Sequence, residues 1–406
     1  MESVDKIKLR VLNRLDRINQ QLGALTQRYR RTFVFFISLY AIMGYAFVIL
    51  FPVLFIISIN QLIEITLAGG TINWLSTSIW TLTILVTGQV SYRMIVTKPI
   101  PAVGFTMPKS KVPQLYNLVE KLRLHFKRPS IARIIVSSHY ELDIVKTPKW
   151  MLPIWSSNTL VIGLPLLICL NPIQFEHMLA RKMGQFSKRH NPVTNWLYQL
   201  NAIWKQYIDI YAKQTSIESL ILKYFFKAYS AVYEKLTVNV AVLDELNADN
   251  YAMERYSHIE ICKMISIDMA CRWFLENRYW PALDKAASTS PPKQLNPYRK
   301  LSDVIKNTFR DENLPKFKQL IIHTEHTNAR LPSLKIRLEN IGHNKPVLKS
   351  MTSESAAEFY LENSLNGALN LMDKLWLKKQ KKEIKTKSRF KNLLKPIFKI
   401  KGGGGN

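Results

Sequence analysis

The order of apolar and polar residues divides the chain into an apolar N-terminal part and a longer mixed part. Between Phe33 and Ile59 the chain carries no charged residue, and about 20 apolar residues are enough to cross the hydrocarbon core of a bilayer. A second apolar run covers residues 72–96, with aromatic residues near both of its ends. We therefore predict a membrane anchor of two transmembrane helices within residues 33–96.

Basic residues flank this anchor on one side only. Residues 1–31 contain eight Lys or Arg, and Arg93 and Lys98 lie at the end of the second run, whereas the connecting residues 60–71 contain no Lys or Arg. The positive-inside rule then predicts a two-span integral membrane protein with both termini and the main domain in the cytoplasm. An alternative interpretation is that the two apolar runs are buried helices of a soluble protein.

Ahead of the anchor, residues 1–31 show a helical pattern. Apolar side chains recur every three or four residues, as in one stripe of an amphipathic helix. The stripe consists of Val4, Ile7, Val11, Leu15, Ile18, Leu22 and Leu25. This basic amphipathic helix could form a short coiled coil, pack on the globular domain, or lie on the membrane.

The formal net charge of +28 points to an anionic partner. Twelve Lys or Arg residues fall within 374–401, beside the membrane if the anchor spans it. No zinc-finger spacing, RNP motif or helix-turn-helix pattern is visible, so we expect anionic membrane lipids rather than nucleic acid as the partner. The oligomeric state is left open.

The basic C-terminal tail, residues 377–406, interleaves apolar and basic side chains in a pattern suited to a lipid surface. The apolar members are Phe390, Leu393, Leu394, Ile397 and Phe398, and the basic members are Lys391, Lys395, Lys399 and Lys401. Pro396 and the run Gly402–Gly405 argue against a long rigid helix here. A solvated, partly disordered tail is the alternative.

Residues 98–376 read as one mixed domain. Apolar spacing predicts a helix over 112–128, and Ile- and Val-rich runs predict strands at 131–137 and 158–163. Asn171 followed by Pro172 is a helix-start signal. The three cysteines show no CxxC spacing, which predicts buried thiols rather than a disulfide framework. The expected fold class is α+β and mainly helical, behind two N-terminal transmembrane helices.

The segment that follows this start signal carries a resemblance. The residues LPLLICLNPIQFEHMLARKMGQFSKRHN, 164–191, align without a gap with a stretch of the form LLxxLSPxExxxVLAHELGHxxxRH. That stretch holds the zinc site of the HtpX and CAAX-prenyl-protease family of membrane zinc metallopeptidases, which this chain therefore resembles.

Further motifs follow in the family's order. The segment 245–249, ELNAD, matches the ExxAD motif that carries the family's third zinc ligand. Residues 330–338 look like the THPSxxxRL segment, and residues 354–358 look like the helix after it. The resemblance covers residues 98–376 and the two preceding spans, and it implies a gluzincin-like metallopeptidase domain.

The departures from the pattern fall on the chemistry. Arg181 and Gln185 stand where the family has zinc-binding His, and Lys182 stands where it has the general-base Glu. A guanidinium has no lone pair to donate, and an ammonium repels a divalent cation. Of the ligands implied by the resemblance only Glu245 survives, and Leu331 replaces a further His. We therefore expect no intact catalytic residues, no zinc and no other cofactor.

We hypothesise that an ion pair replaces the metal. Glu245 and Asp249 would face the helix of residues 181–185, as their counterparts do in the family, so that Arg181 or Lys182 meets a carboxylate. The alternative is that both cations point into solvent. A relocated metal site is a further alternative, for which the candidate side chains are His177, His190, His323 and His326.

The predicted function is that of a pseudoprotease, which binds or scaffolds polypeptides at the cytoplasmic membrane face. In the family an edge strand before the active helix pairs with substrate, and here the matching strand is Asn158, Thr159, Leu160, Val161, Ile162 and Gly163. Such an edge adds an extended peptide through backbone hydrogen bonds. The alternatives are an active zinc metalloendopeptidase with an altered site, and a lipid-surface or assembly element.

Overall fold

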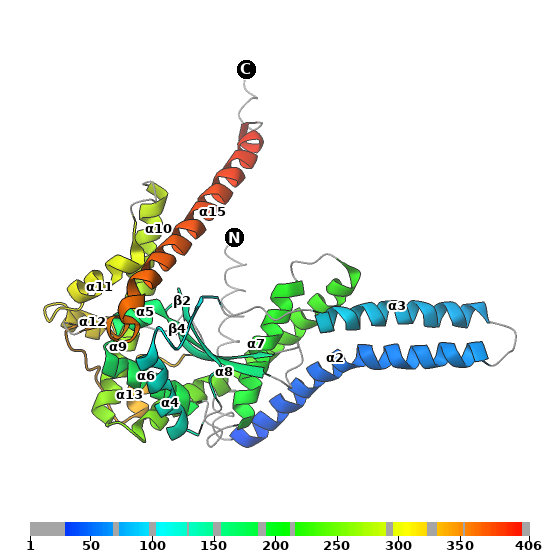
Figure 1. The fold of residues 1–406 in the computed structure, drawn as a ribbon, viewed down its shortest axis with the longest axis horizontal. Helices are drawn as coiled ribbons and strands as arrows, with labels where there is room; N and C mark the ends of the chain where they lie inside the picture. Colours follow the sequence, from blue (N-terminus) through cyan, green and yellow to red (C-terminus); the bar gives the residue numbers. More distant parts are fainter. Residues whose placement is uncertain are drawn as a thin grey trace, which may run out of the picture.

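Two long helices extend from a larger helical body in the computed structural model (Figure 1). The structure describes residues 29–67, 73–96, 103–127, 130–148, 156–185, 192–211, 216–289, 295–322, 331–351 and 354–399. The predicted N-terminal amphipathic helix, His190, His323 and His326 lie outside these ranges. The mainly helical α+β class is confirmed.

The extended pair consists of α2 (Arg30–Leu67) and α3 (Trp74–Val96), which pack side by side. Among the described residues one helix, Arg31–Leu67, is long and apolar enough to cross a membrane, with a mean hydropathy of 2.6. α3 is a helix where the second span was predicted. It does not reach the same apolarity, because seven of its 23 residues are Ser or Thr.

The body contains one four-stranded sheet in the order β1-β2-β4-β3. β2 pairs parallel to β4, whereas the two outer strands pair antiparallel to their neighbours. The strands are β1 (Phe105–Met107), β2 (Arg133–Ser137), β3 (Leu142–Pro148) and β4 (Ser156–Gly163). β2 and β4 lie where the sequence predicts them, and β1 and β3 were not predicted.

Helices surround this sheet and form the rest of the body. In the first half these are α4 (Pro113–His125), α5 (Leu164–Cys169), α6 (Pro172–Gln185), α7 (Pro192–Tyr211) and α8 (Ile217–Met253). In the second half they are α9 (His258–Phe274), the π-helical turn η1 (Leu275–Tyr279), α10 (Trp280–Thr289), α11 (Pro297–Thr308), α12 (Leu314–Ile322), α13 (Leu334–Asn340), α14 (Ala356–Leu361), η3 (Glu362–Ser364) and α15 (Leu365–Lys399).

The predicted start of α6 is confirmed in detail. The Gln174 N–H donates to Asn171 Oδ1 at 2.8 Å, and the Asn171 N–H donates to Gln174 Oε1 at 3.1 Å. This reciprocal pair satisfies N–H groups that the first helical turn leaves without partners. The register of α6 is thereby fixed from its first residue.

The buried side chains of the described residues form two separate clusters. The larger cluster fills the body from Met107 to Trp376 and includes all three cysteines, which are buried and unpaired as predicted. The second cluster joins α2 and α3 to α7 and to the first half of α8. The described side chains of α7 and of the first half of α8 therefore pack with the predicted anchor.

The structure corrects the prediction that Pro396 prevents a long helix in the C-terminal tail. α15 runs without a break across the predicted boundary at 376/377 and through Pro396 to Lys399, so the expectation that Pro396 prevents a long helix is wrong. Proline disrupts the turn that precedes it, and here only the last turns of a 35-residue helix are affected. In Figure 1 the distal part of α15 projects away from the body.

Candidate functional site

The matched motif positions meet where α6 packs against α8. Close approach of the two helices depends on Gly184, because a Cβ atom there would lie 2.6 Å from the Cβ of Tyr251. Arg181, Lys182 and Gln185 come from the C-terminal half of α6, and the acidic residues come from the C-terminal half of α8. Segments about 60 residues apart in the sequence therefore form one site.

Arg181 is the centre of this site and is 4% exposed. Its Nη2 forms a hydrogen-bonded ion pair with the Glu245 carboxylate and also donates to the Glu245 carbonyl oxygen at 3.2 Å. Its Nε lies 2.5 Å from Asp249 Oδ1. The predicted ion pair is confirmed, and the alternative in which Arg181 points into solvent is wrong.

The other two matched positions on α6 also reach Glu245. Lys182 Nζ lies 3.5 Å from Glu245 Oε1, and Gln185 Nε2 donates to the same oxygen at 3.0 Å. Lys182 Nζ also donates to Gln185 Oε1 at 3.0 Å. One buried carboxylate therefore contacts all three side chains that the motif resemblance assigns to the ligand and general-base positions.

Three further charged residues belong to this cluster and were not predicted. Arg337, on α13, is buried and donates to Asp249 through two nitrogens, at 2.9 and 2.7 Å. Its Nη1 lies 3.7 Å from Asp268 Oδ2 on α9, and Arg272 Nη2 lies 3.6 Å from Asp268 Oδ1. Arg337 belongs to the 330–338 motif, which could have identified it. Leu331, in the same motif, is half-buried and adds no polar atom.

The electrostatics follow from this arrangement. Burial disfavours the charged form of Glu245, but the charges of Arg181 and Lys182 outweigh that effect and hold the pKa of this carboxyl well below its usual range. Burial likewise opposes the charge of Arg181, and the carboxylates of Glu245 and Asp249 more than offset it, so the pKa of the guanidinium is raised. Arg181 and Glu245 are therefore both charged in the neutral pH range.

These side chains do not fit a zinc ion. A guanidinium fills the space between the two carboxylates, and Gln185 turns its donor nitrogen, not its oxygen, toward Glu245. Among the described residues no group of three or more His, Cys, Asp or Glu side chains is placed to hold a metal. His177 is buried against Tyr256, with ring centroids 4.2 Å apart, and burial lowers its pKa.

The position predicted for the peptide-binding strand is wrong. β4, which contains Asn158–Gly163, is an interior strand with β2 on one side and β3 on the other. Among the described residues, β3 is the edge strand that contacts α6, and no strand pairs with its outer side. This strand was not predicted because it has only three apolar residues, Leu142, Ile144 and Val145, without a regular alternation, and its second half is mainly polar.

The Asp143 side chain occupies part of the outer edge of β3. The Gly163 N–H donates to the Glu141 carbonyl at 2.7 Å, so alternate residues of β3 direct their N–H groups away from β4. One of these outward groups, the Ile144 N–H, donates to Asp143 Oδ1 at 2.8 Å. Such capping protects an edge strand from indiscriminate pairing.

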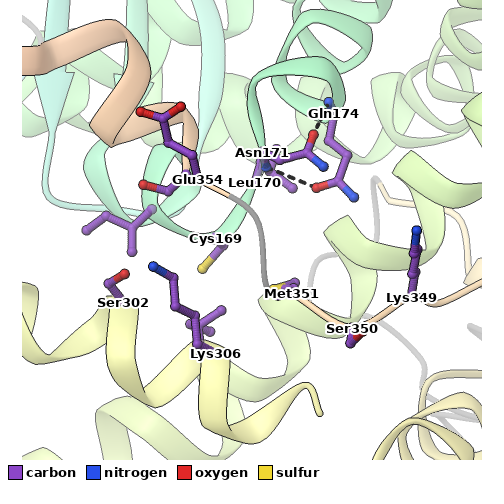
Figure 2. A pocket seen from close by; sticks show the side chains of 13 residues that line it. Cys169, Leu170, Asn171, Gln174, Ser302, Lys306, Lys349, Ser350, Met351 and Glu354 are labelled. Atoms are coloured by element: carbon purple, nitrogen blue, oxygen red, sulfur yellow. Dashed lines mark hydrogen bonds between the residues drawn. The ribbon is translucent and has the colours of Figure 1, made fainter. Parts of the chain in front are cut away.

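A cavity of about 230 Å³ lies at the other end of α6 (Figure 2). Its lining mixes apolar side chains with two lysines, Lys306 and Lys349, and three serines, Ser302, Ser350 and Ser355. Cys169 contributes its sulfur to the wall. None of Arg181, Lys182, Gln185, Glu245 and Asp249 lines this cavity, so it is separate from the ion cluster.

Comparison with known proteins adds no relative to this picture. No protein-family model matches the chain, and no match was found among curated proteins or solved structures.

Proposed function

We propose that this chain is a membrane-anchored, non-catalytic relative of the HtpX and CAAX-prenyl-protease metallopeptidases, a pseudoprotease that binds polypeptides beside the membrane. One observation carries the proposal. The positions that the motif resemblance assigns to the metal site, on α6 and α8, lie in mutual contact around Glu245. An accidental likeness of short motifs gives no reason for those positions to converge.

The same contacts support the absence of catalysis. Hydrolysis by this family's chemistry needs a metal-bound water and a carboxylate to take its proton. Here Arg181 neutralises the carboxylates, and Lys182 occupies the position of the proton acceptor as a cation. The arrangement keeps α6 and α8 joined and leaves no lone pairs for an ion.

Membrane attachment rests first on α2, the one described helix that is long and apolar enough to span. For α3 a second span is supported by its hydrogen bonding. Most of its Ser and Thr hydroxyls donate to the carbonyl four residues earlier, for example Thr81 to Thr77 at 2.8 Å and Thr83 to Ile79 at 2.8 Å. This bonding satisfies the hydroxyls without water. With two spans, the basic flanks favour a cytoplasmic body.

The polypeptide-binding element in this proposal is the outer edge of β3. It is the edge strand that lies against α6, and it offers backbone groups to an extended chain. The capped Ile144 N–H limits binding to partners that displace the Asp143 carboxylate. A partner that brings its own backbone carbonyl to this N–H would do so.

Metal analysis tests the proposal. We expect detergent-purified protein to contain no stoichiometric zinc, and the variant Arg181→His/Lys182→Glu/Gln185→His to take up about one zinc per chain through the two new imidazoles and Glu245. Arg181→Gln/Lys182→Gln serves as a control that removes the same cations without adding ligands. Stoichiometric zinc in the unaltered protein, with proteolysis that a chelator stops, would establish an active enzyme instead. A folded triple variant without zinc would contradict the proposed likeness of the site.

A further inference from the structure

The α7–α8 hairpin packs on only one half of α2. All members of the second hydrophobic cluster that come from α2 lie between Phe33 and Phe51. At 1.5 Å per residue, the 38 residues of α2 span about 57 Å, nearly twice the hydrocarbon thickness of about 30 Å. If α2 spans the membrane, about half of it must therefore lie outside the hydrocarbon core. The half covered by α7 and α8 is the one on the side of the body (Figure 1).

The contact between α2 and α8 is close and built from aromatic rings. Tyr40 and Tyr229 stack with centroids 4.6 Å apart, and each hydroxyl donates to the other residue's backbone carbonyl, at 3.3 and 2.7 Å. Gly44 makes room for this pair, since a Cβ there would lie 2.7 Å from Tyr229 Cζ. These contacts hold α8 at a fixed height along α2.

The contact between α8 and α2 extends along the covered half of α2. The Phe225 ring stacks on Phe47 with centroids 3.5 Å apart, and no member of the cluster from α2 lies beyond Phe51. The exposed side chains of the covered half of α2, Phe35, Leu39 and Ile42 among them, are apolar, whereas Asp209, Lys227 and Lys235 are exposed on the hairpin. Apolar surface and exposed charges therefore occur at one height, as they do where hydrocarbon meets headgroups.

α8 presents an apolar stripe to the outside at the same level. Tyr224 is 64% exposed and Val232 is 48% exposed, and with Ile221, Ala228 and Ala231 they share one face of the helix. Lysines flank the stripe. Aromatic side chains beside lysines are typical of the zone where apolar chains meet anionic headgroups.

We infer that the outward face of α8, from Ile221 to Lys235, lies in the lipid headgroup zone and forms a third membrane contact beside α2 and α3. The inference rests on the proposed membrane span of α2. The occupant of the stripe is lipid because the stripe continues the exposed apolar surface of α2, against which α8 is packed, and because its flanking cations match anionic headgroups. α7 and α8 thereby fix how deeply the anchor sits.

Fluorescence quenching in lipid nanodiscs tests this placement. A thiol-linked fluorophore would be attached to the single variants Tyr224→Cys and Val232→Cys. The chain's own three cysteines are buried, and the unaltered chain treated with the same fluorophore measures any background labelling of them. Ile57→Cys on α2 is the membrane reference, and Leu320→Cys on α12 is the aqueous reference, with exposed fractions of 45% and 44%. The discs would contain lipids that carry a nitroxide at the headgroup or deep in the acyl chain.

We expect headgroup nitroxides to quench the Tyr224→Cys and Val232→Cys labels several-fold more than the Leu320→Cys label. Deep nitroxides should quench Ile57→Cys most. If Ile57→Cys is quenched but the two α8 labels behave like Leu320→Cys, the headgroup placement is wrong while the span stands. Labels on α8 that are shielded from water without being quenched would show a protein on this face and also overturn the placement. No quenching at Ile57→Cys would refute the span itself.

Discussion

Removal of Arg181 should destabilise the body strongly, because two carboxylates then remain buried with fewer cations. The substitution Arg181→Met keeps most of the aliphatic volume and removes the charge. Loss of one partner from a buried ion pair costs about 3–5 kcal/mol. Asp249 would keep both hydrogen bonds from Arg337, and Glu245 would keep Lys182 at 3.5 Å and Gln185 at 3.0 Å. The remaining partners place the expected loss near the lower limit, about 3 kcal/mol.

Denaturant titration of the detergent-solubilised protein, followed by tryptophan fluorescence, would measure this loss. Arg181→Met/Glu245→Gln should recover part of the stability, because the double variant removes the uncompensated charge as well. Lys335→Met on α13 is the matched control. Its ion pair with Glu339, at 4.0 Å, is exposed, and exposed pairs contribute little.

The effect should also depend on pH, with a sign fixed by Glu245. The pKa of this carboxyl is lower in the folded protein than in the unfolded chain, so its ionisation contributes stability above the unfolded pKa of about 4.3. That contribution is lost as the pH falls through the folded pKa. The difference in free energy of unfolding between Arg181→Met and the unaltered chain should therefore shrink below about pH 4. A difference under about 1 kcal/mol at neutral pH, the range of exposed pairs, would refute a buried, essential ion pair.

Two further predictions concern binding surfaces. A photo-crosslinker at Val145 on β3 should capture an unfolded, alkylated model polypeptide in proportion to the polypeptide's concentration. The same crosslinker at Leu320 on α12 is the control and should not capture it. Equal capture at both positions would rule out β3 as the binding edge. Deletion of residues 378–401 should weaken binding to vesicles that contain anionic lipid and leave binding to neutral vesicles unchanged, as measured by flotation, because the deletion removes eleven of the chain's Lys and Arg residues. Unchanged flotation with anionic vesicles would show that the basic residues of this tail do not bind anionic lipid.

The parts of the site that sequence could predict were those held in a fixed register. The cap at Asn171 set the phase of α6, and the resemblance to the metallopeptidase motifs then predicted that Arg181 faces Glu245, 64 residues away in the sequence. Arg337 was not predicted, because the motif pattern indicates metal ligands and a guanidinium cannot ligate a metal. Its buried bidentate contact with Asp249 depends on how α13 packs, which spacing alone does not reveal.

The predictions that failed depended on which surfaces pair. β4 was predicted as a strand, but tertiary packing determines which strands pair with it. β3, which pairs with one edge of β4, was not predicted because Asp143 and Lys146 make it too polar to be recognised as a strand. The apolar faces of α7 and α8 show that they are buried and do not show that their partner is α2. Periodicity identifies a face, and only the folded chain identifies what lies against it.

The length of α8 has a mechanical consequence. Tyr229, which is clamped to α2, and Glu245, which holds the α6 side chains, belong to one unbroken helix and lie about 24 Å apart along it. A continuous helix behaves as a stiff rod, so if α2 spans a membrane, its tilt in a thinner or thicker bilayer would displace Glu245 against α6. In that case α8 is a lever that connects the thickness of the bilayer to the buried carboxylate that contacts Arg181, Lys182 and Gln185.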